Sequence, residues 1–188
     1  MRLLRVTYQD TAGSGRPIVR YAFVTEDPAR FAERMGGTMV TDTGIGFRRL
    51  ARTHTILLSF FEYFIGNTDW ALPPRHNIAV LRTDTLYALP FDFDWAGAVD
   101  APYAVPNTRI LHIRTVRERQ YRGICQTSDS VIAQFVALRD SIAALYRAVP
   151  GLAPRGAERT IRYYDEFYQA LADRQRFEDR VVAPDCSW

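Results

Sequence analysis

The residues best suited to chemistry gather in one segment, IGNTDWALPPRHNIAVLRTDTLYALPFDFDW, which spans residues 65–95. Its candidates for binding a metal or moving a proton are Asp69, His76, Asn77, Asp92 and Asp94, whereas Asp84 is interpreted as a turn residue. Carboxylate and amide oxygens suit Mg²⁺, and a neighbouring carboxylate can orient or deprotonate an acceptor hydroxyl. The chain holds three histidines, too few for a His-rich zinc site. The segment is a candidate for magnesium-dependent phosphoryl transfer, and Asp69 taken alone could equally be a turn residue.

A predicted hairpin brings two of these side chains together. The sequence predicts a strand over 76–82, a turn at Thr83–Asp84 and a second strand over 86–94. Adjacent strands lie about 5 Å apart, so Asn77 near the start of the first strand can face Asp92 near the end of the second.

A long helix, predicted over 47–64, should deliver the chain to this hairpin. Its apolar residues recur at three- and four-residue spacing, and they are Leu50, Ile56, Leu57, Phe60, Phe61 and Phe64. Gly66–Asn67 should end the helix. We therefore expect the side chain of Asp69 to converge on one cleft with those of Asn77 and Asp92.

The motifs GNTD, HN and DFD, in this order, resemble the catalytic core of atypical protein-kinase-like folds. The nearest likenesses are the spore-coat-protein-H kinases and, more distantly, the HipA-like toxin kinases. The resemblance implies that Asp69 is the catalytic base and that Asn77 and Asp92 bind metal. His76 would brace the loop. Asp94 stands where kinases usually carry a glycine, and it would share metal binding with Asp92 or cap the following turn.

The N-terminal part fits the same resemblance. Branched and aromatic residues over 3–10 and 18–27 flank a turn cluster, which predicts an antiparallel hairpin. In a kinase-like protein this hairpin would be the last two strands of the N-lobe. Residues 22–27 would then be the hinge beside the adenine, with Glu26 and Asp27 as nucleotide-binding residues.

The resemblance implies an α+β fold, a protein-kinase-like C-terminal lobe with the last N-lobe hairpin and hinge. Residues 1–188 would form a single kinase-like domain, in which 1–27 are the remnant of the N-lobe and 28–188 are a mostly helical C-lobe with the catalytic hairpin. ATP and Mg²⁺ are the implied cofactors, and a protein Ser/Thr hydroxyl is the implied acceptor.

Two absences keep other functions open. No Gly-rich phosphate loop precedes the hairpin, and the chain has no Lys at all, for which Arg is not an equivalent replacement. A strand that begins at Met1 indicates an N-terminally truncated kinase. One alternative is a pseudokinase or binding module that keeps the fold without turnover. Another is a phosphodiesterase with two metals about 4 Å apart, held by Asp69, Asp92 and Asp94.

The other predicted elements are helical. A short helix is predicted over 28–36, opened by Pro28 and stopped by Gly36. The stretch 38–46 is loop-like. Near the C-terminus, helices are predicted over 128–149 and 159–180.

Composition describes an ordinary globular protein, with 47% hydrophobic and 24% charged residues. The net charge is +3, and the arginines are spread without a dense run, so no nucleic-acid partner is expected. The most apolar stretch, 56–65, is too short to span a membrane and contains Glu62. The first residues lack the apolar core of a signal peptide, so the protein is cytoplasmic or, if a leader is missing from this sequence, exported.

Two cysteines, Cys125 and Cys186, lie far apart and lack metal-ligand spacing. The interpretation we favour is two unrelated thiols, as in a cytosolic protein. In an exported protein they could instead form a disulfide that ties down the C-terminal tail.

Overall fold

The computed structural model describes residues 2–13, 15–109 and 111–186. The chain divides into two compact units, Met1–Met39 and Val40–Trp188. Helices account for 40% of the residues and strands for 16%, and the sheets are small and antiparallel. This mixture confirms the predicted α+β class.

No helix in the described ranges has both the length and the apolar character needed to cross a membrane.

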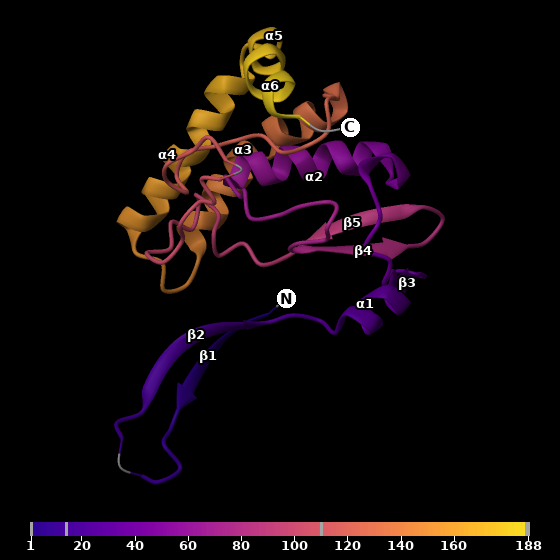
Figure 1. The fold of residues 1–188 in the computed structure, drawn as a ribbon. Coiled ribbons are helices and arrows are strands. Elements are labelled where there is room, and N and C mark those ends of the chain that lie inside the picture. Colours follow the sequence, from indigo (N-terminus) through magenta and orange to yellow (C-terminus); the bar gives the residue numbers. More distant parts are fainter. Residues whose placement is uncertain (1, 14, 110, 187–188) are drawn as a thin grey trace. The chain divides into compact units, whose positions relative to one another are not determined.

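The first unit is built on the predicted hairpin. Strands β1 (Arg2–Tyr8) and β2 (Ile18–Val24) pair antiparallel, with Tyr8 opposite Ile18 (Figure 1). The strands are shorter than predicted because Asp10 starts a turn, in which its side chain accepts the Ala12 amide. Ser14, in the same predicted turn, lies outside the described residues. Large apolar side chains are exposed along both strands, namely Leu3, Leu4, Tyr8, Ile18, Val19, Tyr21, Phe23 and Val24.

Helix α1 (Pro28–Arg34) follows this hairpin, with Pro28 in its first turn as predicted. The helix gives way to a turn at Gly36, whose φ of +68° suits glycine. The short strand β3 (Thr38–Met39) ends the unit, so the stretch expected to be loop-like begins as a strand.

In the second unit, the predicted helix over 47–64 is interrupted near its start. A 3-10 turn covers Phe47–Arg49, and the main helix α2 runs over Arg52–Ile65. Between them the backbone is extended, because the Ala51 amide donates to the Leu86 carbonyl at 2.8 Å. This contact with a strand outweighs the local preference for helix.

Strands β4 (Ile78–Arg82) and β5 (Leu86–Pro90) form the second hairpin, with Ile78 opposite Pro90. Helix α2 lies along this hairpin (Figure 1). The core between them is formed by Leu58, Trp70, Leu72, Ile78, Val80, Leu86 and Ala88. Strand β5 ends at Pro90 and not at residue 94, so Asp92 lies in irregular backbone after the strand, with φ of +61°.

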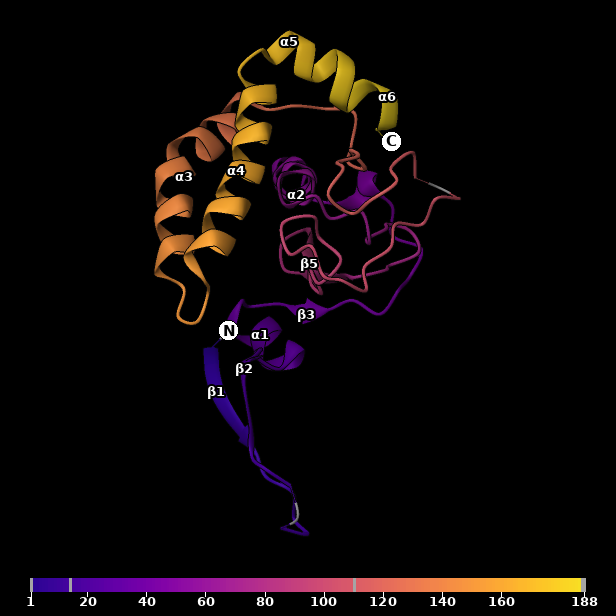
Figure 2. The ribbon, with the colours of Figure 1, turned by 90° about the vertical axis from the view of Figure 1, so that its left-hand side faces the viewer.

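A pair of helices, α3 (Asp129–Ala148) and α4 (Pro154–Leu171), packs beside α2 (Figure 2). The contact is aromatic: the rings of Phe64 and Tyr164 stack with centroids 4.1 Å apart. Phe60, Phe135 and Phe167 belong to the same core cluster. The helix predicted over 128–149 is therefore confirmed.

The single helix predicted over 159–180 is wrong. Helix α4 ends at Leu171, and α5 (Arg174–Phe177) starts a new direction because the Asp173 side chain accepts the Arg176 amide at 3.0 Å. This break lets Phe177 reach the aromatic core, where it is 1% exposed. A π turn over 178–182 and helix α6 (Ala183–Asp185) complete the described chain apart from Cys186.

The two cysteines form a disulfide. Cys125 and Cys186 are joined across a sequence separation of 61 residues, with their Cα atoms 4.9 Å apart. Our preferred interpretation of two unrelated thiols is wrong, and the alternative, a bond that ties down the C-terminal tail, is the arrangement in the structure.

The chain around Gly123 packs very closely on α2, which leads to a first prediction. A Cβ at position 123 would overlap the side chain of Ser59, whereas a Cβ at Gly46 would meet no atom within 4 Å. We expect Gly123→Ala to lower the free energy of unfolding by about 3 kcal/mol, because overpacking forces backbone shifts. Gly46→Ala, the control, should change it by less than about 0.5 kcal/mol. Urea denaturation measures both, and equal effects would contradict the close packing.

Candidate functional site

The loop after α2 holds Asp69 in a fixed position. Gly66 ends the helix with φ of +68°, and Asn67 Oδ1 then accepts the Asp69 amide at 3.0 Å. Asn67 and Thr68 are buried, and Trp70 packs in the core. The carboxylate of Asp69 is thus the accessible group on an otherwise buried turn, with its side chain 30% exposed.

Two neighbours orient the Asp69 carboxylate. His76 Nε2 lies 3.0 Å from Oδ1, and Asn77 Nδ2 donates to Oδ2 at 2.9 Å and to the Asp69 carbonyl at 2.8 Å. Asn77 has φ of +54°, a backbone conformation that asparagine tolerates better than most residues. Because its amide nitrogen is used in this way, the Asn77 side-chain oxygen remains as the atom able to bind a cation.

The long loop between these residues is closed by its own hydrogen bonds. Ala71 and His76 exchange backbone hydrogen bonds, each 3.1 Å long. The guanidinium of Arg75 donates to the carbonyls of Val40 and Thr41, at 2.5 and 2.7 Å. These hydrogen bonds hold the loop between Asp69 and His76 in place.

Asp92 follows Phe91, the residue that lies opposite Asn77 at the end of the hairpin, so the register is one residue from the predicted facing of Asn77 and Asp92. The Phe91 amide donates to the Asn77 carbonyl at 3.1 Å, which extends the pairing of β4 and β5 by one step. The pKa of Asp92 is raised, first by partial desolvation and then by the negative charges of Asp94 and Asp69. The carboxylates are therefore close enough to repel one another.

Asp94 is held by a different contact. Its carboxylate accepts a hydrogen bond from the Tyr103 hydroxyl at 3.0 Å. Phe93, between the two aspartates, turns inward and meets Phe61 of α2 edge-on, with ring centroids 5.6 Å apart. This anchor orients Asp92 and Asp94 away from the core.

The donor set fits a hard divalent cation. Asp92, Asp94 and the Asn77 oxygen offer oxygen ligands, and the mutual repulsion of the carboxylates is what a cation would relieve. In the described part of the chain, no group of three or more His, Cys, Asp or Glu side chains is placed so that it could hold a metal ion. Mg²⁺ is commonly held by one or two carboxylates and completed by substrate phosphates and water, which agrees with so small a set.

The structure adds one residue to this site that the sequence analysis missed. Arg122 donates from Nη1 to the Thr68 carbonyl at 2.5 Å, and no other described residue hydrogen-bonds its guanidinium. Burial lowers the pKa of Arg122, and the charge of Asp69 raises it. Since no motif surrounds Arg122 and it lies 54 residues from Thr68 in sequence, no local signal could have found it.

Glu26 and Asp27, expected in the hinge, belong to the first unit and are engaged there. Glu26 forms an ion pair with Arg34 at 2.6 Å, and this hydrogen bond lowers the pKa of Glu26. The Asp27 carboxylate caps α1 by accepting the amides of Ala29 and Arg30 at 3.0 and 3.1 Å. Asp69, His76, Asn77, Asp92 and Asp94 are the predicted site residues that the second unit brings together.

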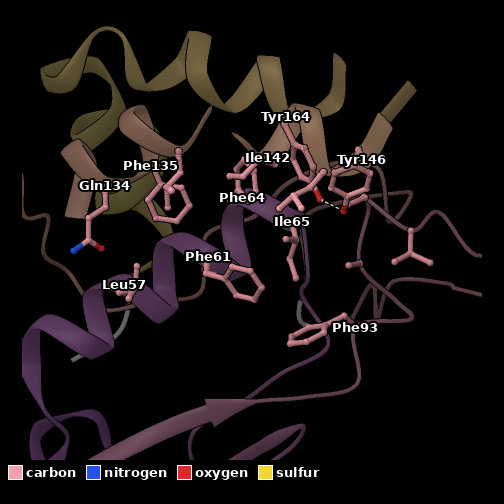
Figure 3. A pocket seen from close by; sticks show the side chains of 15 residues that line it. Leu57, Phe61, Phe64, Ile65, Phe93, Gln134, Phe135, Ile142, Tyr146 and Tyr164 are labelled. Carbon is pink, nitrogen blue, oxygen red and sulfur yellow. Dashed lines mark hydrogen bonds between the residues drawn. The ribbon is translucent and has the colours of Figure 1, made fainter. Parts of the chain in front are cut away.

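An apolar cavity of about 460 Å³ lies behind Phe93, between α2 and the pair α3–α4 (Figure 3). Gln134 lies at one end of it, and the hydroxyls of Tyr146 and Tyr164 are hydrogen-bonded at 2.6 Å at the other. The titratable groups in its lining are these two tyrosines. The cavity lining therefore contains no carboxylate or histidine, and Phe93, which lies between Asp92 and Asp94 in sequence, is part of that lining.

Comparisons with protein families, with curated proteins and with solved structures found no match to this chain. A functional inference therefore depends on the geometry of the site and on the resemblance of its motifs.

Proposed function

We propose that this chain is the C-terminal lobe and hinge of an atypical kinase, similar to the spore-coat-protein-H kinases, that transfers a phosphoryl group from ATP to a protein Ser/Thr hydroxyl. The observation that carries the proposal is the position of the Asp69 carboxylate. It accepts a hydrogen bond from Asn77 Nδ2 at 2.9 Å and lies 3.0 Å from His76 Nε2. It is also close enough to Asp92 for its charge to raise the pKa of Asp92. A fixed carboxylate next to a cation-binding oxygen set is what phosphoryl transfer requires.

Each residue has a distinct role in the proposal. Asp69 accepts a hydrogen bond from the acceptor hydroxyl, orients it and takes its proton. Asn77 and Asp92, with Asp94, hold Mg²⁺, which supplies charge neutralisation at the phosphates when it is bound. His76 keeps Asp69 in one rotamer.

Arg122 is the cation that we assign to the phosphate side of this site. The chain has no Lys, so any fixed positive charge there must come from Arg or His. Arg122 donates one hydrogen bond to the backbone carbonyl of Thr68, and its other N–H groups have no hydrogen-bond partner among the described residues. The negative charge of Asp69 acts to raise the pKa of Arg122. A guanidinium with unused donors suits phosphate oxygens.

A pseudokinase or binding module is the second candidate, and the absence of Lys favours it. In that case the chain would bind Mg²⁺–ATP without transferring phosphate. The third, a metal-dependent phosphodiesterase, would cleave a phosphodiester with metal and show no affinity for ATP.

Replacing Asp69 tests the proposal directly. Asp69→Ala and the isosteric Asp69→Asn should leave the affinity for Mg²⁺–ATP nearly unchanged, because Asp69 contacts the acceptor and not the nucleotide. The rate of phosphotransfer to Ser/Thr peptides should fall by about 10²–10⁴-fold, the usual contribution of a general base. Calorimetry and a radiolabel transfer assay on the full chain give the two quantities. Undiminished transfer in both variants would refute the role of Asp69, and absence of transfer by the wild type with ATP bound would leave the pseudokinase.

A further inference from the structure

Helix α2 carries a glutamate, Glu62, in the protein interior, where an ionised carboxylate would be destabilised by loss of water. Glu62, in the last turn of the helix, is 1% exposed, and neither carboxyl oxygen has a hydrogen-bond partner among the described residues. It continues a buried polar row with Thr55 and Ser59, spaced four and three residues apart. Ser59 meets the neighbouring segment, since its Oγ accepts the Ile124 amide at 3.4 Å.

Glu62 is linked to the candidate site through Asn67. The backbone amide of Asn67 donates to the backbone carbonyl of Glu62 at 2.8 Å. The side-chain oxygen of Asn67, Oδ1, accepts a hydrogen bond from the backbone amide of Asp69. Asn67 is itself 1% exposed, and its side-chain nitrogen has no hydrogen bond of ordinary geometry in the described chain. Asn67 is also the one group that lowers the pKa of Glu62, so its amide lies near the carboxyl. The side chain of Asn67 therefore lies between the Glu62 carboxyl and the backbone amide of Asp69.

Burial keeps Glu62 in its neutral form. Desolvation raises its pKa to about 8, and no charged group from another element opposes this shift. Charged and titratable residues packed around the end of α2 include Tyr63, Arg117, Arg119, Tyr121, Arg122, Tyr163, Tyr164 and, paired with Arg119, Glu166. Arg119 donates to the backbone carbonyls of Tyr63, Phe64 and Tyr163 and to the Glu166 carboxylate. Arg122 donates to the Thr68 carbonyl, so neither arginine is directed at Glu62.

We propose that Glu62 is a positioning residue. Its neutral carboxyl stays buried beside Asn67, and through Asn67 it keeps the Asp69 loop in the arrangement described above, which we call closed. This rests on the proposed role of Asp69. An unpaired carboxylate cannot stay buried at low cost, so ionisation favours any state in which the loop opens and Glu62 meets water.

The direction of the pH effect follows from linkage. Between the ordinary glutamate pKa of 4.5 and about 8, the closed state keeps a proton that the opened or unfolded state loses. The closed state is therefore at its most stable below pH 4.5, loses stability as the pH rises to about 8, and then levels off. Opening should become easier by about tenfold per pH unit within this window.

Hydrogen exchange of the Asp69 amide in the full chain tests the proposal without nucleotide. In the wild type, protection corrected for intrinsic exchange should fall by about tenfold per pH unit from pH 5 to 8. Glu62→Gln cannot ionise and should show nearly pH-independent protection. Glu118→Gln, the control, changes an exposed glutamate of the same unit and should follow the wild type.

Two outcomes would overturn the proposal. One is the same pH dependence in wild type and Glu62→Gln. The other is a Glu62 carboxyl that titrates near the ordinary glutamate value in carbon-13 NMR of the wild type, a measurement that stays valid if Glu62→Gln fails to fold. Neither readout needs phosphotransfer, so failure of the kinase proposal would be seen separately, in the transfer assay.

Discussion

Replacing Asp92 with alanine is expected to lower the affinity for Mg²⁺–ATP by about a hundredfold while leaving the weak metal-free binding unchanged. The triphosphate is strongly anionic, and in the proposed site Asp92 would provide, with Asn77 and Asp94, the oxygen ligands through which the metal bridges it to the protein. Asp92 follows the residue that pairs with Asn77 at the open end of the β4–β5 hairpin, where desolvation and then the charges of Asp94 and Asp69 raise its pKa. Calorimetric titration with ATP, in the presence of Mg²⁺ and of a chelator, measures the difference.

The same hairpin offers a matched control. Asp84, in the turn at the other end, is exposed and hydrogen-bonded to Thr83, and Asp84→Ala should bind Mg²⁺–ATP as the wild type does. Wild-type affinity in Asp92→Ala would contradict the assignment of the metal site. Metal-dependent cleavage of a phosphodiester without ATP affinity would instead support the phosphodiesterase.

Removing the disulfide is expected to lower the free energy of unfolding by about 4 kcal/mol, because the bond closes a long loop in the unfolded chain. The loop between Cys125 and Cys186 spans a separation of 61 residues and includes α3, α4 and α5. Urea denaturation of Cys125→Ser/Cys186→Ser against the oxidised wild type measures this change.

Reductant supplies the control for that experiment. It should destabilise the wild type by a similar amount and leave the double variant unaffected. Equal stability of oxidised wild type and double variant would mean that strain or residual structure cancels the loop entropy.

Much of the element order could be predicted because short-range signals determine it. Branched and aromatic runs around a turn predicted the pairing of β1 with β2, and Pro28 predicted the start of α1. The placement of Asp92 within one residue of the position opposite Asn77 could be predicted for the same reason, since a hairpin with a short turn constrains the register of its ends. The kinase-like activity stays a prediction.

Tertiary contacts decided the remaining features. Ala51 is extended because of Leu86, and α4 ends at Leu171 so that Phe177 can enter the aromatic core. The disulfide and the approach of Arg122 to Thr68 join residues more than 50 positions apart.

Glu62 shows most clearly what a sequence alone determines and what it leaves to the fold. The stretch FFEYF indicates an apolar helix face, and there the glutamate counted only as a charge that disfavours a membrane span. Its environment depends on the segment around Gly123 and on helix α4, which pack against α2 from distant parts of the chain. Local sequence can therefore place a carboxyl on a helix, but the desolvation that keeps its proton is set by whichever residues the complete fold packs around it.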